Sequence, residues 1–286
     1  MNTVRAKSAV RDLLAPERRA GRTIGLVPTM GSFHDGHLAL MRQARADCDL
    51  VVVSLFVNPA QFGQGEDLAG YPRDEARDAR MAEEEGVDLL FAPPPEEIYP
   101  DGFDATVSVG GLTAVLEGDP GQRGAGHFAG VTTVVTKLFN IVQPDVAYFG
   151  QKDAQQALVV RKLVRDLDLP VRIEVVPTVR DGHGLALSSR NAYLSAEDRE
   201  RALGLGRALR AAERTVANGE VAAADVLAAA RAELERAGID PEYLELRSPR
   251  DLSPVERVNG SALLAVAARV GRARLIDNTI LRGGNR

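Results

Sequence analysis

Two histidines three positions apart, His34 and His37, are the residues of this sequence whose types and spacing best predict chemistry. They follow an apolar run over 23–27 that is typical of a buried strand, and they precede a segment over 38–46 with helical spacing of apolar residues. A helix N-terminus offers free N–H groups and a partial positive charge, which favour a bound phosphate. Because residues three apart on a helical turn share a face, we expect both imidazoles to reach one ligand.

Polar side chains also gather in three later segments, Asn58–Gln61, Gly150–Gln156 and Leu187–Asn191. The first two each follow a strand-like apolar run, and the third lies in a turn-rich stretch. In an open α/β sheet, ligands bind outside the carboxyl ends of the strands. We therefore expect these segments to converge with the histidines on one cleft. Their hydroxyl, guanidinium and ammonium groups would surround a polyphosphate there.

Gln61, Gln156 and Asp153 suit other parts of the ligands. The two amides are uncharged and fit the hydroxyls and carboxyl group of a small polar substrate, and Asp153 fits the hydroxyls of a ribose. Each feature taken alone also fits a structural role, such as an N-cap or a solvated loop. The prediction therefore depends on all four segments meeting.

The elements that must position these residues alternate between strand and helix over 23–177, which favours a doubly wound parallel sheet. We also expect a helix over 1–20 and a strand over 106–109. After 178 the pattern changes to Ala- and Arg-rich helices followed by three strand-like runs. The sequence therefore predicts an α/β fold with a Rossmann-like catalytic domain over 1–177 and a smaller C-terminal α+β domain over 178–286.

The bulk properties exclude several classes of protein. Of 286 residues, 45% are hydrophobic and 26% charged, and the net charge of −5 gives no basic field for nucleic acid or an anionic membrane. Cys48 is the single cysteine, which excludes an internal disulfide framework and fits a reducing compartment. No apolar run approaches the ~20 residues of a membrane span. We expect a cytoplasmic enzyme that binds neither nucleic acid nor membrane.

Several catalytic motifs are absent from the sequence. It contains no G-x-x-x-x-G-K-[ST], no usable G-x-G-x-x-G, no H-E-x-x-H and no G-x-S-x-G. Two histidines with one distant cysteine also make a poor zinc site. We therefore expect no protein metal site and no prosthetic group.

The motifs themselves carry a resemblance to a known family. His34–His37 resembles the H-x-G-H signature of the nucleotidylyltransferase superfamily. The full set is more specific and resembles the pantothenate synthetase (pantoate–β-alanine ligase) family. This set comprises Pro28-Thr29-Met30-Gly31, Phe56-Val57-Asn58-Pro59-x-Gln61-Phe62, Leu116-Glu117-Gly118, His127-Phe128-x-Gly130-Val131, Phe149-Gly150-Gln151-Lys152-Asp153-x-Gln155-Gln156, Asp181 to Asn191, and Leu275-Ile276-Asp277-Asn278.

The resemblance implies a two-step reaction and a homodimer. Pantoate and Mg-ATP give enzyme-bound pantoyl adenylate and pyrophosphate, and the β-alanine amine then attacks the acyl carbon to give pantothenate and AMP. Mg²⁺ travels with the ATP. By motif match, the ATP-binding residues are Met30, Gly31, Ser32, Phe33, His34, Asp35, Gly36, His37, Gly150, Gln151, Lys152, Asp153, Val179, Leu187, Ser188, Ser189 and Arg190.

The resemblance also assigns the substrate-binding and catalytic residues. Gln61, Gln156 and Met30 would hold pantoate, and Gln61 would border β-alanine. His37 matches the proton donor of the family. Because a carboxylate is already ionised at pH 7, its attack on phosphorus needs positioning and charge stabilisation instead of a base. The predicted catalytic residues, which supply these, are His37, His34, Lys152 and Arg190. No base for the amine is evident.

The chain departs from the family pattern at Gln151, where Glu is usual, at His183, where Asp is usual, and at Leu187, where Met is common. The loop over 118–126, a candidate cover for the adenylate, is also longer than usual. Two other interpretations stay open at this point. One is another H-x-G-H nucleotidylyltransferase that transfers AMP or CMP to a small phosphorylated substrate, and the other is a nucleotide-sensing module.

Overall fold

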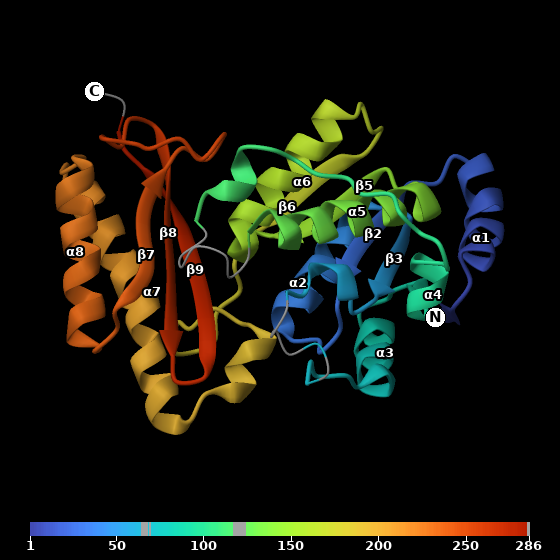
Figure 1. Ribbon diagram of the computed structural model, residues 1–286, viewed down its shortest axis with the longest axis horizontal. Helices are drawn as coiled ribbons and strands as arrows, with labels where there is room; N and C mark the ends of the chain where they lie inside the picture. Colours follow the sequence, from blue (N-terminus) through green and yellow to red (C-terminus); the bar gives the residue numbers. More distant parts are fainter. Residues whose placement is uncertain (64–67, 69, 117–123, 285–286) are drawn as a thin grey trace. The chain divides into compact units, whose positions relative to one another are not determined.

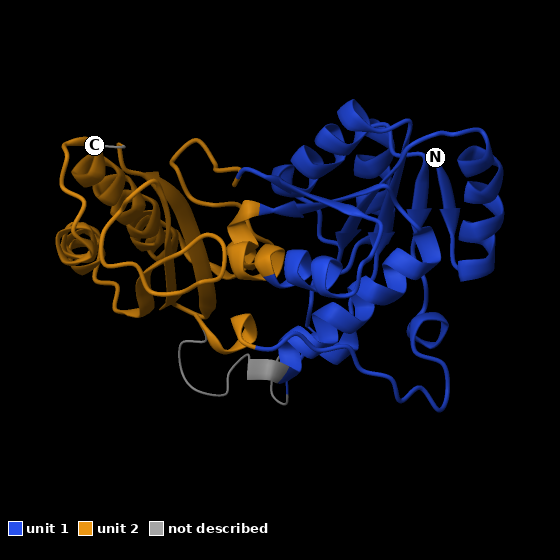
Figure 2. Ribbon diagram, turned by 90° about the horizontal axis from the view of Figure 1, so that it is seen from above, with its two compact units in different colours: residues 1–110, 123–150, 159–177 blue, residues 111–122, 151–158, 178–286 orange. Residues whose placement is uncertain are grey.

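The structure is a computed structural model that describes residues 1–63, 68, 70–116 and 124–284. The chain divides into two compact units, coloured separately in Figure 2. The first comprises 1–110, 123–150 and 159–177, and the second comprises 111–122, 151–158 and 178–286. Relative to the predicted division after residue 177, two short segments of the first part group with the second unit.

The first unit contains a six-stranded sheet in which all neighbouring strands are parallel (Figure 1). In spatial order the strands are β1 (Asn2–Val4), β4 (Leu89–Phe91), β3 (Leu50–Leu55), β2 (Ile24–Thr29), β5 (Val146–Gly150) and β6 (Arg172–Val176). The central strands are apolar and almost wholly buried, as in parallel sheets with both faces covered. The chain adds β3 and β4 on one side of β2, and β5 and β6 on the other. The strand order therefore reverses at β2, where such sheets bind their ligands.

Helices connect these strands. They are α1 (Lys7–Arg19), α2 (Asp35–Asp47), α3 (Glu75–Glu84), α4 (Pro95–Ile98), α5 (Gly124–Val142) and α6 (Ala154–Asp166). Helix α2 packs on β2 and β3 through Leu38, Met41 and Ala44, and α1 packs on α5. This arrangement confirms the predicted Rossmann-like doubly wound domain. None of the helices within the described ranges is long and apolar enough to cross a membrane.

The second unit contains a three-stranded antiparallel sheet with β8 in the centre. Its strands are β7 (Pro241–Arg247), β8 (Ser261–Val270) and β9 (Ala273–Arg282), and its long helices are α7 (Ala196–Ala217) and α8 (Ala223–Arg236). The small side chains of α7, such as Ala208 and Ala212, pack with Leu264 and Val266 of β8 in one apolar core. This unit confirms the predicted α+β character of the C-terminal part.

Two local predictions are wrong. Residues 1–20 are not one helix, because Asn2–Val4 pairs in parallel with β4 and the helix begins only at Lys7. Residues 106–109 form no strand. The N–H of Val107 donates to Thr133 Oγ1 at 3.0 Å, and its carbonyl accepts from Thr132 Oγ1 at 2.5 Å. Threonines of α5 therefore satisfy backbone groups that a neighbouring strand would otherwise pair.

Candidate active site

The turn between β2 and α2 carries both predicted histidines. His34 is the N-cap of α2, and its Nδ1 accepts a hydrogen bond from the Gly36 N–H at 3.1 Å. His37 Nδ1 accepts one from the His34 N–H at 3.4 Å, which completes a capping box, and the two ring centroids lie 4.2 Å apart. Because each Nδ1 is an acceptor, each neutral ring carries its proton on Nε2. A Nε2–H group is a suitable donor to a phosphate oxygen.

The loop before the histidines has an unusual backbone. Gly31 and Ser32 both have left-handed conformations, with φ of +85° and +56°. A Cβ on Gly31 would lie 2.7 Å from Leu55 Cδ1 and 3.0 Å from Asp78 Oδ2. Gly31 is therefore required both by its conformation and by this close approach. For Ser32 the same region costs about 1–3 kcal/mol, so surrounding contacts must hold it there.

Asp78 on α3 supplies those contacts, and the sequence analysis missed it. Its carboxylate is 1% exposed and accepts hydrogen bonds from the N–H groups of Ser32 at 2.7 Å and Phe33 at 2.8 Å. Arg77 donates to the Phe33 carbonyl at 3.1 Å. Asp78 lies four residues before Ala82, and both are buried residues of an otherwise polar helix.

Gln61 stands at the end of η1 (Pro59–Gln61), a single 3₁₀ turn after β3, and its side chain is held at both ends. Asn58 Nδ2 donates to Gln61 Oε1 at 3.1 Å, and Gln61 Nε2 lies 3.1 Å from Met30 Sδ. The structure thus brings together Met30 and Gln61, two of the residues predicted to hold pantoate. The amide nitrogen carries a second N–H for a further acceptor.

Buried groups around Asn58 fix this arrangement. Asn58 is 1% exposed, donates to the Gly130 carbonyl at 3.1 Å and accepts from the Tyr99 hydroxyl at 2.7 Å. Burial raises the pKa of Tyr99 to about 12, although its bond to Asn58 lowers it, so the phenol remains a donor at neutral pH. A Cβ on Gly130 would meet the Ala60 carbonyl oxygen at 2.2 Å, which makes glycine necessary where α5 passes η1.

His127 is the third histidine near these segments, and its Nδ1 lies 2.7 Å from the Gln61 carbonyl oxygen. In the sequence, His127 is marked only by the motif His127-Phe128-x-Gly130-Val131. Asn58 carried a detectable signal, because an Asn immediately before Pro59 is a favourable N-cap, and its Oδ1 accepts from the Ala60 N–H. Tyr99 carried none, since its partner is 41 positions away in the sequence.

In the second unit, Lys152 lies in η3 (Gln151–Asp153), a single turn between β5 and α6. Its side chain is 18% exposed, and Nζ lies 3.6 Å from Asp153 Oδ2. Gln156 follows in the first turn of α6 and is half-buried. The neighbouring Gln155 donates to the backbone carbonyls of Leu112 and Val115, which gives that amide a structural role.

The segment over 179–191 is a compact hairpin followed by a turn. The Leu187 N–H donates to the Val179 carbonyl at 3.0 Å. Asp181 Oδ1 accepts from the N–H groups of His183 at 2.9 Å and Leu185 at 3.0 Å. Ser188 then caps η4 (Ser189–Tyr193) by accepting the Arg190 N–H at 3.2 Å. His183 is exposed and contributes its backbone to this turn.

The predicted site residues are divided between the two units. The first unit holds Met30 to His37, Gln61 and Gly150, and the second holds Gln151 to Asp153, Gln156, Val179 and Leu187 to Arg190. The candidate cover over 118–126 lies outside the described residues at positions 118–123. Within the part of the chain that the structure describes, no group of three or more His, Cys, Asp or Glu residues could hold a metal ion.

Known proteins of one family resemble this chain over almost its whole length. The model of the pantoate–β-alanine ligase family matches residues 2–280. The chain belongs to this family. A pantothenate synthetase from Heliobacterium modesticaldum is 52% identical over 285 residues, covering 97% of this chain and 99% of that protein. A second pantothenate synthetase, from Moorella thermoacetica, is 51% identical and covers 98% and 99% of the two chains.

Solved structures of pantoate–β-alanine ligases agree in fold. Pantothenate synthetase from Thermus thermophilus has a TM-score of 0.92 and 49% identity, covering 98% of this chain and 99% of its own. The ligase from Francisella tularensis, complexed with β-γ ATP and β-alanine, has a TM-score of 0.78 and 32% identity, covering 98% and 97%. These findings confirm the resemblance, the fold class and the predicted ligase activity. They do not support the alternative nucleotidylyltransferase.

Proposed function

We propose that the chain catalyses the ATP-dependent condensation of (R)-pantoate with β-alanine to pantothenate, through a pantoyl-adenylate intermediate, with release of AMP and pyrophosphate. The observation that carries this proposal is the match of residues 2–280 to the pantoate–β-alanine ligase family. The β-γ ATP and β-alanine bound to the Francisella tularensis enzyme support ATP and β-alanine as substrates here. We further propose that the protein is a cytoplasmic homodimer.

In the first step, the pantoate carboxylate attacks the α-phosphorus of ATP. The Nε2–H groups of His34 and His37 donate to phosphate oxygens, and Lys152 and Arg190 stabilise the negative charge on the departing pyrophosphate. His37 also serves as the proton donor that the family resemblance implies. The remaining ATP contacts come from the backbone and short side chains of Met30 to Gly36, Gly150 to Asp153, Val179 and Leu187 to Ser189.

Pantoate is held by neutral groups. Gln61 has one N–H directed at Met30 and its carbonyl engaged by Asn58, which leaves its second N–H for a pantoate oxygen. Gln156 supplies a second amide for the hydroxyls and carboxylate of pantoate. These amides bind the carboxylate without a counter-charge, so the carboxylate stays nucleophilic.

In the second step, β-alanine binds beside Gln61 and its free amine attacks the acyl carbon. The C–N bond forms, the bond to AMP breaks, and the proton that the amine loses passes to solvent or to the departing AMP. Mg²⁺ enters as part of Mg-ATP, since this ion is commonly held by substrate phosphates with few protein ligands. The protein residues need only position the phosphates and exclude water from the adenylate.

The test incubates the protein with Mg-ATP and D-pantoate, with and without β-alanine, and follows AMP, pyrophosphate and pantothenate. With β-alanine, we expect AMP and pantothenate to accumulate in equal amounts over many turnovers. Without it, we expect the reaction to stop after the first turnover. The stereoisomer L-pantoate is the matched control substrate. Absence of β-alanine-dependent AMP would overturn the proposal.

A further inference from the structure

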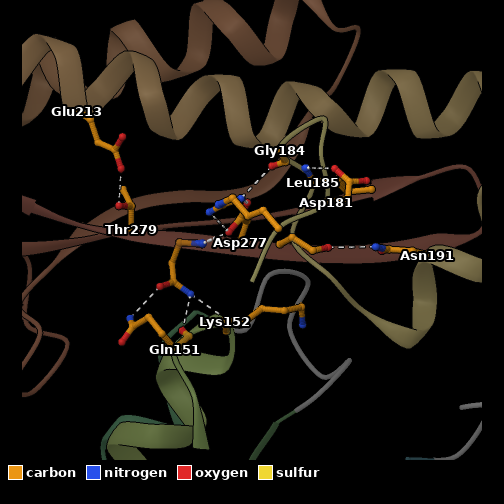
Figure 3. Close-up of polar contacts among 12 residues, drawn as sticks. Gln151, Lys152, Asp181, Gly184, Leu185, Asn191, Glu213, Asp277 and Thr279 are labelled. Atoms are coloured by element: carbon orange, nitrogen blue, oxygen red, sulfur yellow. Dashed lines mark hydrogen bonds and ion pairs between the residues drawn. The ribbon is translucent and has the colours of Figure 1, made fainter. Parts of the chain in front are cut away.

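Two neighbouring residues of β9, Asp277 and Asn278, are polar yet almost fully buried, at 3% and 5% exposed. Burying a carboxylate and an amide is costly unless each finds hydrogen-bond partners. Figure 3 shows the region around them, within the second unit. Both side chains are directed at segments that contain predicted ATP-binding residues.

Asn278 holds the backbone of the Lys152 turn. Its Nδ2 donates to the carbonyl oxygens of Gln151 at 2.9 Å and Lys152 at 2.8 Å, and its Oδ1 accepts from Gln151 Nε2 at 2.9 Å. Both N–H donors of the amide are therefore used on consecutive carbonyls of one short turn. Because a single 3₁₀ turn has few bonds of its own, these contacts set the direction in which the Lys152 side chain leaves the backbone.

Asp277 holds the start of the 180–191 segment. It receives two hydrogen bonds from the guanidinium of Arg180, at 2.6 and 2.9 Å, and Arg180 also donates to the Gly184 carbonyl at 3.2 Å. Burial lowers the pKa of Arg180. The bonds to Asp277 and the negative charges of Asp277 and Glu213 raise it by more, so the pKa lies above the ordinary value. Arg180 therefore stays charged, and its two parallel bonds to Asp277 fix the entry to the hairpin.

We propose that Asp277 and Asn278 are positioning residues for the ligase reaction, with Asn278 acting through Lys152 and Asp277 acting through the 180–191 segment that carries Ser188 to Arg190. The inference rests on the proposed function. Because the two residues are adjacent on one strand, β9 fixes the placement of two ATP-binding segments relative to each other within the second unit. A purely structural pair would contribute to folding alone.

The decisive experiment compares Asn278→Ala with Thr279→Val. Thr279 is the next residue on β9, and its hydroxyl donates to Glu213 on α7 at 2.6 Å, so Thr279→Val removes a hydrogen bond from the same strand. We expect Asn278→Ala to lower kcat/KM for ATP about 10- to 100-fold, as misplacement of a catalytic group does, and Thr279→Val to stay within about twofold of the parent. Equal activities of the two variants would overturn the role of Asn278.

A double-mutant cycle separates positioning from general destabilisation. In a Lys152→Ala background, Asn278→Ala should weaken ATP binding little further, because the group that it positions is gone. Independent effects that multiply would contradict the proposal. ATP affinity is measured by titration calorimetry, which needs no turnover, and thermal unfolding checks that each variant is folded.

Amide hydrogen exchange tests whether Asn278 and Asp277 hold different segments. Asn278→Ala should speed exchange over 150–153 more than over 180–191, and Asp277→Asn should do the reverse. Uniformly faster exchange across β9 and both segments would overturn the separate assignments. Failure of the parent protein to make pantothenate overturns the proposed function and this inference together. An active parent whose Asn278→Ala variant matches Thr279→Val overturns only the role of Asn278.

Discussion

The His34–His37 turn of the first unit is held largely by itself, whereas the Lys152 turn of the second unit is held from far away in the sequence. His34 and His37 cap each other and the start of α2 within four residues. The carbonyls of Gln151 and Lys152 are instead bound by Asn278, 127 and 126 positions later. The two histidines are thus positioned by local bonds, whereas the Lys152 turn is positioned by bonds from a remote strand.

This difference indicates which residues the geometry of each turn depends on. A self-capped turn keeps its geometry as long as its own few residues and the Asp78 carboxylate are intact. A turn bound by a remote strand depends on the packing of β9 as well. Substitutions should therefore change stability and catalytic rate in different proportions at the two turns. Substitutions at five positions test this, from the largest expected effect to the smallest.

His37→Ala and Lys152→Ala should each slow adenylate formation about 10²- to 10³-fold, because each removes a group that stabilises charge in the transition state. Their stabilities should differ. His37→Ala also removes half of the capping box, at a cost of about 1 kcal/mol, whereas Lys152 loses only a partly exposed ion pair, at ~0.5 kcal/mol or less. Rapid-quench pyrophosphate release and urea unfolding measure the two quantities. Parent-like rates would contradict the site assignment.

Asp78→Asn should destabilise the protein by about 2–3 kcal/mol, because two backbone N–H groups lose a charged acceptor and the amide presents an N–H in place of one oxygen. The rate of adenylate formation should fall with it, since Ser32 is no longer held. Glu84→Gln, an exposed substitution on the same helix, should change stability by less than ~0.5 kcal/mol. If both variants unfold alike in urea, the turn is held without Asp78.

Tyr99→Phe should cost about 1 kcal/mol, the value of the hydrogen bond to Asn58. Because Asn58 orients Gln61, we also expect KM for pantoate to rise severalfold with little change in KM for ATP. Steady-state kinetics with each substrate varied in turn provide the measurement. An equal rise in both KM values would indicate a general effect on folding instead.

Asp181→Asn should have the smallest effect on stability. The Asp181 carboxylate belongs to a turn of the second unit that local hydrogen bonds hold. Burial raises the pKa of Asp181, but the N–H groups of Leu185 and His183 and the charge of Arg199 lower it more, so the net pKa is below the ordinary value. The stabilisation is thus present above the unfolded pKa of about 3.9 and is lost as the pH falls through the folded value. Urea unfolding from neutral to acidic pH should show a smaller acid-induced loss for Asp181→Asn than for the parent. Matching slopes would contradict this.

The sequence predicted the elements and segments that depend on near neighbours. The alternation of strands and helices, the H-x-G-H turn and the polar ends of β3 and β5 each follow from a periodicity or motif within a few residues. The assignment of ATP and pantoate contacts to single residues stays a prediction, since it came from the family resemblance.

The remaining features depend on partners that no local pattern reveals. The strand at Asn2–Val4 is only three residues long and exists because β4 offers an edge to it. Val107 lies among β-branched residues, which favoured the predicted strand, but its backbone is bonded to helix threonines and not to a neighbouring strand. Asp78 and Tyr99 are ordinary polar residues in the sequence, and Asn278 is only the end of a motif. The importance of Asp78 and Asn278 comes from burial, and that of Tyr99 from its bond to Asn58, which only the tertiary structure creates.

The 126-residue separation in sequence between Lys152 and Asn278 has a consequence for synthesis of the protein on the ribosome. At about 5–20 residues per second, a ribosome adds Asn278 about 6–25 s after Lys152, when the six parallel strands have already been synthesised. The nascent chain can therefore complete the sheet and the histidine turn while the carbonyls of Gln151 and Lys152 are still exposed to water. We expect the protein to reach its full ATP affinity only after β9 has left the exit tunnel. Synthesis of β9 would then determine when the new chain becomes active.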